Sequence, residues 1–566
     1  MLRRSTSACA VVAILGTLHP QATSGSETVE IIFHGGTIYS FSRDDGSPVE
    51  AIAVAGGRVA AIGPLAEVEN LATSATRRID LQGATLLPGL VDAHAHLFNL
   101  GRSLQQAQLR GTVSADDCIE RAQATEATLP PGVWLQGRGW DQNDWEVQMY
   151  PDRRLLDEAF GDRPVYLRRI DGHAAWVNSA ALAAAGIDSD TPDPEGGEIL
   201  RDPATGEATG IVIDAAEDLV TDAIPVETAE QLDRIVALAT EDARAKGLVG
   251  VHEMGVTLAQ WGALQRAAAA GTLPIRVVAY LGGRKVLDEY EGGPIRPEAS
   301  ARLRLEGVKL YADGALGSRG AALLADYSDR PGHRGLMQSS EEALTQAAAK
   351  SLERGFSVAL HAIGDRGNRI ALAAISNGYA AAKHARQDLP DLRDMRCRIE
   401  HAQIVHPDDI PRFGQLGILP SMQPTHCTSD MPWAPVRLGE ARLVGAYAWR
   451  SFRASGTIVP LGSDFPVEKV SPLLGLHAAL TRQQPDGNPE GGWSPDQRLS
   501  PQEAVLGFTA WAADACGVAE WGRLRRGDQA DMTILSVDPL KHGPQEILGA
   551  RVVGTVVGGE LSAQLR

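Results

Sequence analysis

Residues 84–98, "ATLLPGLVDAHAHLF", place two histidines one residue apart at the end of an apolar run. In a β-strand, residues i and i+2 point to the same side, so His94 and His96 can bind one ion. Imidazole is a ligand that suits zinc. An HxH pair is also explained by two polar side chains that end a buried strand. The stretch therefore predicts a strand and raises the hypothesis of a metal site.

Short apolar runs alternate with alanine-rich helical segments through the middle of the chain. They include "IRVVAYLG", "GVKLYAD", "FSVALHAIGD", "RCRIEHAQI" and "GTIVPLGSDF". This alternation is typical of βα units around a parallel sheet, and the number of repeats predicts a (β/α)8 TIM-like barrel over residues 88–520. The predicted class is α/β, with a doubly wound sheet as the alternative.

The two ends of the chain have a different texture, with alternating apolar residues and glycine pairs. "VEIIFHGGTIYSFS" lies near one end and "VVGTVVGGELSAQL" near the other. Such patterns favour antiparallel strands, so residues 25–87 and 521–566 are expected to form one β-sandwich domain. An irregular stretch at about 101–224 contains four tryptophans and is interpreted as an insertion that walls a pocket.

Polar side chains also end the later apolar runs. In a parallel barrel the C-terminal ends of all strands share one face, where such folds assemble their sites. Glu400 adjoins one of these residues but is expected to point to the opposite side of its strand. Lys309, His361, His401 and Asp464 end these runs, so they are expected to share one site with His94 and His96.

An ordered set of motifs runs from about residue 29 to residue 559: "LLPGLVDAHAHL", "HAAWVNSAAL", "KLYADGALGSRGAAL", "HAIGDRGN", "IEHAQ", "GSDFPV" and "LRRGDQADMTIL". The set resembles the amidohydrolase superfamily, and closely its amidohydrolase family 3 branch, which includes N-substituted formamide deformylases. The resemblance implies a barrel with an accompanying β-sandwich, a metal site, and hydrolysis of carbon-nitrogen bonds other than peptide bonds, in amides or N-formyl and N-acyl amines.

The resemblance also implies the set of metal ligands, which is His94, His96, Lys309, His361, His401 and Asp464. In two-metal members a lysine of the fourth strand is carboxylated and bridges the ions, and Lys309 matches that position. A free ammonium has no lone pair, so Lys309 can be a ligand only as N6-carboxylysine. A buried lysine paired with Asp313 is the alternative. The expected cofactor is one or two divalent ions, with zinc favoured by the ligand types.

The expected chemistry begins with a water whose pKa a bound ion lowers to about 7. Asp464 is expected to accept the water proton and pass it to the leaving amine. His173 in "DGHAAWVN" is a candidate for polarising the carbonyl oxygen, with a structural histidine as the alternative. Candidates for substrate binding are Trp140, Arg319 and Asp365, and His426 is a further candidate for the pocket.

Two other functions remain open on the same fold. A hydrolase of a phosphoester or lactone, or a deaminase, would change the reaction, but deaminases of this superfamily typically use one metal and lack the bridging lysine. A non-catalytic exported binding protein would be marked by a lost ligand, and no predicted ligand is missing.

Charge and the first residues restrict partners and location. Lys and Arg number 53 against 71 Asp and Glu, and the net charge of -18 argues against nucleic acid as a partner.

Residues 1–24 are typical of a secretory signal peptide, which predicts a periplasmic or secreted protein with no transmembrane span in the mature chain. An uncleaved anchor is the alternative. We expect a small-molecule substrate, and the sequence leaves a homodimer open. Cys9 lies within the predicted signal peptide. The four cysteines of the mature chain are expected to be isolated and buried. They are Cys118, Cys397, Cys427 and Cys516.

Overall fold

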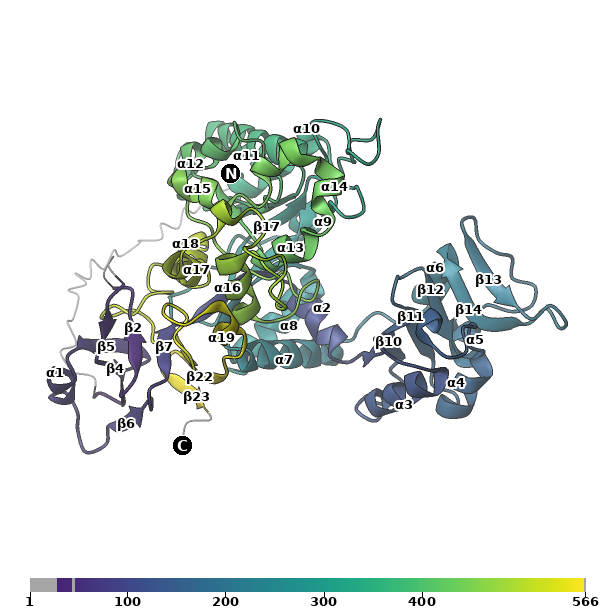
Figure 1. Ribbon diagram of the computed structural model, residues 1–566, viewed down its shortest axis with the longest axis horizontal. Helices are drawn as coiled ribbons and strands as arrows, with labels where there is room; N and C mark the ends of the chain where they lie inside the picture. The colour runs from purple at the N-terminus through teal and green to yellow at the C-terminus, as the bar shows by residue number, and fades with distance from the viewer. Residues whose placement is uncertain (1–27, 43–45, 564–566) are drawn as a thin grey trace, which may run out of the picture.

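The structure is a computed structural model that describes residues 28–42 and 46–563. Figure 1 shows three parts side by side: a β-rich part made of the two chain ends, a central barrel, and an insertion that stands apart from the barrel. The predicted signal peptide, residues 1–24, lies outside the described residues. Within those residues, no helix combines the length and apolar character needed to cross a bilayer.

Seven parallel strands form the central sheet, in the order β20-β19-β18-β17-β16-β15-β8. Their side chains are almost all buried, because helices cover the outside of the sheet and the strands enclose its inside. This is why the strands read as continuous apolar runs. They are β8 (Leu90–Ala95), β15 (Leu248–Val256), β16 (Arg276–Gly282), β17 (Leu303–Tyr311), β18 (Ser357–Ala362), β19 (Arg398–His401) and β20 (Leu419–Ser421).

The segment 457–464 fills the gap between the two edge strands. On one side the Met422 N–H donates to the Pro460 carbonyl at 3.0 Å, and on the other the Ala93 N–H donates to the Leu461 carbonyl at 3.0 Å. The run "GTIVPLGSDF" therefore takes the place of the eighth strand. The predicted α/β class and TIM-type barrel are confirmed, and the doubly wound alternative is wrong.

Helices surround this ring, and several begin at the caps that the sequence supplies. Thr228 and Thr257 each form a capping box with a glutamine three residues later, at the starts of α7 and α8. The helices are α2 (Leu97–Ser103), α7 (Ala229–Ala245), α8 (Leu258–Ala269), α9 (Gly283–Glu289), α10 (Glu341–Glu353), α11 (Asp365–Ala385), α12 (Ile410–Leu416), α13 (Pro424–Asp430), α14 (Ala434–Leu438), α15 (Trp449–Ala454), α16 (Pro472–Thr481), α17 (Pro501–Gly507), α18 (Ala510–Ala515) and α19 (Pro544–Leu548).

Two sheets are built from the ends of the chain. One has the order β5-β4-β1-β6 and the other β23-β22-β21-β7-β2-β3, in which β21 pairs antiparallel with β7. Phe33 and Ile52 of the first sheet and Leu86, Met532 and Val556 of the second belong to one apolar core. This core therefore needs both chain ends. The elements are β1 (Ile31–His34), β2 (Thr37–Tyr39), β3 (Pro48–Val49), β4 (Ala51–Ala55), β5 (Arg58–Gly63), α1 (Leu65–Glu69), β6 (Arg77–Asp80), β7 (Thr85–Pro88), β21 (Met532–Leu535), β22 (Val552–Val557) and β23 (Glu560–Ala563).

The insertion is the segment between α2 and α7, and it has a six-stranded sheet of its own in the order β13-β14-β12-β11-β10-β9. Separate apolar clusters lie on this sheet, so the insertion has its own core. Its elements are β9 (Ala107–Gln108), α3 (Ala115–Glu126), β10 (Leu135–Trp140), α4 (Arg153–Phe160), β11 (Val165–Arg169), β12 (Ala174–Val177), α5 (Ser179–Ala184), β13 (Gly197–Arg201), β14 (Ala208–Asp214) and α6 (Ala215–Thr221).

The four cysteines outside the predicted signal peptide are buried and unpaired, as expected. They are Cys118, Cys397, Cys427 and Cys516. No disulfide is present among the described residues, so the packing of the three parts rests on noncovalent contacts.

Glu503 in the first turn of α17 predicts how stability depends on pH. Burial raises its pKa, but hydrogen bonds from Ser500 and Arg450 outweigh burial and lower the pKa to about 2. The ionised carboxylate therefore stabilises the fold above its unfolded pKa of about 4.3, and this contribution is lost as the pH falls toward 2. We expect Glu503→Gln to lower the thermal midpoint by roughly 1–3 °C at pH 6 and by less at pH 3. Glu520→Gln, at an exposed carboxylate, is the control; an equal loss at both pH values would contradict the prediction.

Candidate metal centre

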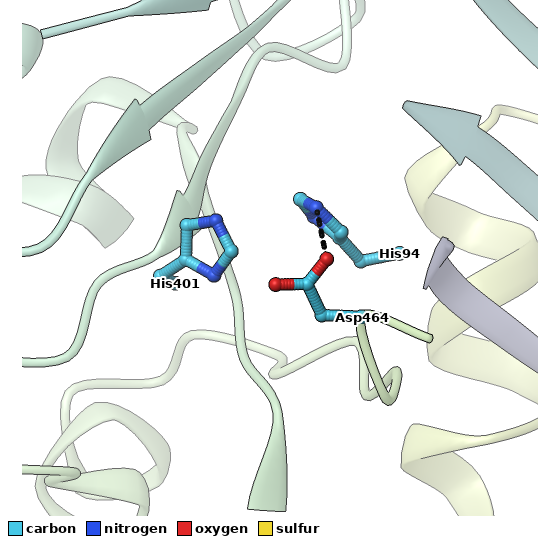
Figure 2. Close-up of side chains that lie close together, drawn as sticks. All are labelled: His94, His401 and Asp464. Carbon is cyan, nitrogen blue, oxygen red and sulfur yellow. Dashed lines mark ion pairs between the residues drawn. The ribbon is translucent and has the colours of Figure 1, made fainter. Parts of the chain in front are cut away.

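Three of the predicted ligands meet at the end of the barrel where the strands have their C-termini, which we call the mouth. His94 is the next-to-last residue of β8, His401 ends β19, and Asp464 ends the segment that closes the ring. One ligand atom from each lies within 4.8 Å of the others, and all three residues are buried. Figure 2 shows the three side chains facing a common point, with His94 Nε2 3.5 Å from Asp464 Oδ1.

The other three predicted ligands lie beside this cluster. His96 Nε2 is 3.2 Å from Asp464 Oδ1, and the His361 ring centroid is 4.6 Å from that of His401. Lys309 is buried on β17, where its Nζ lies 5.4 Å from the centroid of the Tyr311 ring, and that ring lies 5.7 Å from the ring of His361. The structure therefore brings all six predicted ligands to one place.

Four atoms in this centre are buried without a hydrogen-bond partner among the described residues: His94 Nε2, Lys309 Nζ, His361 Nε2 and Asp464 Oδ1. A buried polar atom without a partner costs free energy, and a coordinated cation would supply the partner. Burial, together with the charge of Lys309, lowers the pKa of His94 to about 4 and that of His361 to about 3. Both imidazoles are then neutral near pH 7 and offer a lone pair. The residues present fit a divalent metal ion.

Two groups orient the histidines. His94 Nδ1 lies 2.6 Å from Glu400 Oε2, so its N–H donates to the carboxylate and Nε2 faces the centre. His401 Nδ1 donates in the same way to Gln423 Oε1 at 2.9 Å. Glu400 is held in turn by the fully buried guanidinium of Arg398.

The expectation that Glu400 points away from the centre is wrong. His401 has a φ of 71°, in the left-handed region, so the alternation of the strand ends there. The side chains of Glu400 and His401 therefore both point into the barrel. A signal was present in the sequence: Arg398 and Glu400 lie two residues apart in a buried strand. Two charges on one face of such a strand must pair or bind something.

Asp464 is fixed by a histidine that follows β20. His426 Nε2 lies 3.1 Å from Asp464 Oδ2, and its Nδ1 lies 3.6 Å from Glu468. Burial alone would lower the pKa of His426, but the hydrogen bonds to these two carboxylates raise it to about 10. His426 thus reaches the pocket as a cation, and it leaves Oδ1 of Asp464 directed at His94 and His96.

Trp140 does not line the centre, so its assignment to substrate binding is wrong. It is fully buried in the core of the insertion, where its ring lies 5.8 Å from Trp145 and 6.4 Å from Trp176, and its indole N–H donates to the Leu167 carbonyl at 2.7 Å. The cause is that the insertion forms its own sheet and must fill its own core. The aromatic residues serve that core instead of a barrel wall.

Because Trp140 is a core residue, we expect Trp140→Ala to lower the free energy of unfolding of the insertion by about 3–5 kcal/mol. Urea unfolding followed by circular dichroism measures this. Leu155→Ala, at a partly exposed position of α4, is the control and should cost far less. Unchanged stability combined with a raised KM would instead support a role in substrate binding.

The other three predicted residues are placed as follows. His173 lies on the insertion, away from the cluster; its side chain is 71% exposed, and Nδ1 is 2.7 Å from Asp214. Arg319 pairs with Asp329 at 2.8 Å, and Asp365 accepts the Leu324 N–H at 2.8 Å. Arg319 and Asp365 therefore hold the loop that follows β17, and their contact with substrate stays a prediction.

Comparison with known proteins identifies the class to which this fold and centre belong. The sequence model of the amidohydrolase family matches residues 77–563, and the chain belongs to that family. YtcJ of Bacillus subtilis is 34% identical over 540 residues, covering 94% of this chain and 99% of its own. The N-substituted formamide deformylase of Arthrobacter pascens is 29% identical over 533 residues, covering 91% and 95%. The crystal structure of an uncharacterized metal-dependent hydrolase from Pyrococcus horikoshii has a TM-score of 0.75 at 29% identity, covering 91% of this chain and 99% of its own.

Proposed function

We propose that this protein is a metal-dependent hydrolase of carbon-nitrogen bonds other than peptide bonds, and that its substrates are N-formyl or N-acyl amines. The observation that carries the proposal is the set of four buried ligand atoms without a hydrogen bond at the mouth of a barrel of the amidohydrolase family. The similarity to a formamide deformylase supports the choice of substrate class.

These residues would hold a divalent ion, which would supply an acidified water and a positive charge beside the substrate carbonyl. Asp464 lies where it can accept the water proton, and the bond from His426 to Oδ2 keeps the carboxylate in that orientation. Glu400 and Gln423 hold the histidines in the tautomer that offers Nε2. Neutral ligands and an ionised Asp464 are the protonation states that this reaction requires.

Three finer assignments belong to the proposal. Zinc is the preferred ion because imidazole nitrogens dominate the ligands. Lys309, as N6-carboxylysine, would bridge two ions, since its buried amine has no other partner among the described residues. The two end sheets, which share a core, form one β-sandwich domain, and the protein is exported through residues 1–24.

The experiment uses the purified chain reconstituted with zinc, with metal measured by mass spectrometry. N-formyl, N-acetyl and N-aryl amines form the test panel, and a phosphotriester, a lactone and an aminopyrimidine form the comparison panel. We expect zinc-dependent turnover of the first panel that a chelator abolishes. Turnover of the comparison panel alone would contradict the proposed bond type.

A further inference from the structure

The insertion is joined to the barrel at the mouth and touches it little elsewhere. It leaves after α2, which follows β8, and returns at the start of α7, so both connections lie at the mouth end. They are linked by an ion pair between Arg102 and Glu227, and Arg234 of α7 donates to the Thr128 carbonyl at 2.9 Å. A cavity of about 490 Å³ lies between these connections, lined in part by Trp134 and Ile235. The joint is loosely packed.

One end of the insertion sheet collects exposed groups, and we call it the tip. β10 and β11 are parallel and end together, with Trp140 opposite Arg169. The loop 141–152 and the turn 170–173 therefore lie at this end. The loop exposes 65% of Val147 and 68% of Met149, while the turn carries His173 with its partner Asp214.

Exposed apolar surface is concentrated on the insertion and on the barrel mouth. Of the fourteen large apolar side chains that are exposed among the described residues, seven lie on the insertion or its connections, and five lie at the end of β17 or in the segments that follow barrel strands. Exposed apolar side chains gathered on two parts of one molecule are candidates for an interaction surface. The seven are Leu104, Val113, Val147, Met149, Tyr150, Leu155 and Val226, and the five are Tyr311, Leu336, Val436, Val444 and Val467.

The mouth residues of this set lie next to the metal ligands. Tyr311 follows Lys309 by two residues, and its ring is 5.7 Å from that of His361. Val467 follows Asp464, to whose carbonyl its N–H donates at 3.0 Å, and 70% of it is exposed. A surface that covered these side chains would also cover the metal centre.

Charges on the two surfaces are complementary. Asp144 and Glu146 of the tip have no ion-pair partner within residues 28–42 and 46–563. At the mouth, Lys285, Arg330 and Arg366 follow barrel strands and are exposed, and they too lack an ion-pair partner in the part of the chain that the structure describes. Acidic and basic groups so placed favour the approach of tip and mouth.

We propose that the insertion closes over the mouth of its own barrel, and that closure brings His173, held by Asp214, onto substrate at the metal centre. Val147 and Met149 then become part of the wall around the group carried by the substrate nitrogen. His173 acts as a catalytic residue there, donating a hydrogen bond to the carbonyl oxygen on which charge develops. This role of His173 rests on the proposed hydrolase function, whereas the docking does not.

The part of the protein that covers the mouth is the insertion of the same chain, because its two connections, after α2 and before α7, start at the rim of the mouth. The contact between Arg234 and Thr128 already holds the insertion at this rim, at the end of its sheet opposite the tip. The insertion of a second copy would have to reach the mouth without the two chain connections that hold the insertion close to its own barrel.

Closure is tested by measuring a distance between two spin labels on the zinc-loaded full chain carrying Cys9→Ser. Labels are attached at Glu158→Cys on α4 and Ala380→Cys on α11, both exposed, while the four remaining native cysteines are buried. We expect a shorter distance population that Val147→Asp with Met149→Asp abolishes. Leu71→Asp, at an exposed apolar site on neither surface, should leave it unchanged.

Two outcomes would overturn closure within one chain: a single long distance that none of the variants alters, or a short distance that vanishes when labelled chains are diluted with unlabelled ones. The second outcome would assign the mouth to a second copy. Absence of amide hydrolysis would refute the proposed function but would leave this distance measurement intact.

The role of His173 has its own readout. His173→Ala should lower kcat by about 100-fold with little change in KM and should remove one limb of the pH profile, and His173→Gln should recover part of the loss. Met149→Asp should raise KM for N-benzylformamide about tenfold and that for formamide less than twofold. A normal kcat for His173→Ala, with the short distance retained, would overturn the catalytic role.

Discussion

Replacing His94 with alanine is expected to lower kcat/KM for the best amide substrate by about three orders of magnitude, which corresponds to about 4 kcal/mol of lost transition-state stabilisation. His94 contributes a ligand atom to the cluster with His401 and Asp464. The variant should also bind less metal, which mass spectrometry measures independently of activity.

His384→Ala is the matched control because His384 is exposed near the end of α11 and makes no contact with the centre. It should keep both the metal content and kcat/KM within about twofold. If His94→Ala kept its turnover and its metal, the centre would not be the site of catalysis.

The ligand set was predictable from sequence because two simple regularities apply. A strand period of two puts His94 and His96 on one side, and a parallel barrel gathers the ends of its strands at one mouth. Lys309, His361 and Asp464 could therefore be assigned from single apolar runs. Among the described residues, His426 is a further histidine that contacts Asp464 and His401. The sequence already made it a candidate for the pocket.

The orientation of Glu400 was predicted wrongly because the alternation was counted from His401, whose backbone angles composition does not encode. His401 and Asp464 have φ values of 71° and 63°, and both lie where a strand pattern would have been extrapolated. Non-glycine residues in this region are strained, and functional sites are where such strain is found. The alternation rule fails at the end of a strand, where the ligands lie.

The insertion was recognised as a unit, but the role of its tryptophans was not. An apolar residue in an insertion can fill the insertion's own core or face a neighbouring surface, and sequence does not distinguish these when the number of strands is unknown. Six strands with helices on them are enough for a separate core, which Trp140 and Trp176 fill. The apolar residues of the insertion that do reach the surface, such as Val147 and Met149, include no tryptophan among the described residues.

Lys309→Ala is expected to lower kcat/KM by about 100- to 1,000-fold and to reduce the metal content to one ion per chain or less. The lysine amine is buried without a partner among the described residues, and burial lowers its pKa to about 8. More of it is therefore neutral near pH 7 than for an ordinary lysine, and a neutral amine can add carbon dioxide. The resulting carbamate would offer two oxygens to the ions.

Short carboxylates distinguish this role from that of a buried counter-ion. Formate, acetate or propionate should restore part of the activity of Lys309→Ala, because they supply the two oxygens in the space left by the side chain. Lys309→Arg is the matched control: it keeps the positive charge, forms no carbamate, fills the space, and should not be rescued. If Lys309→Arg were as active as the parent, or removal of bicarbonate left the metal content of the parent unchanged during reconstitution, Lys309 would act as a charge and not as a ligand.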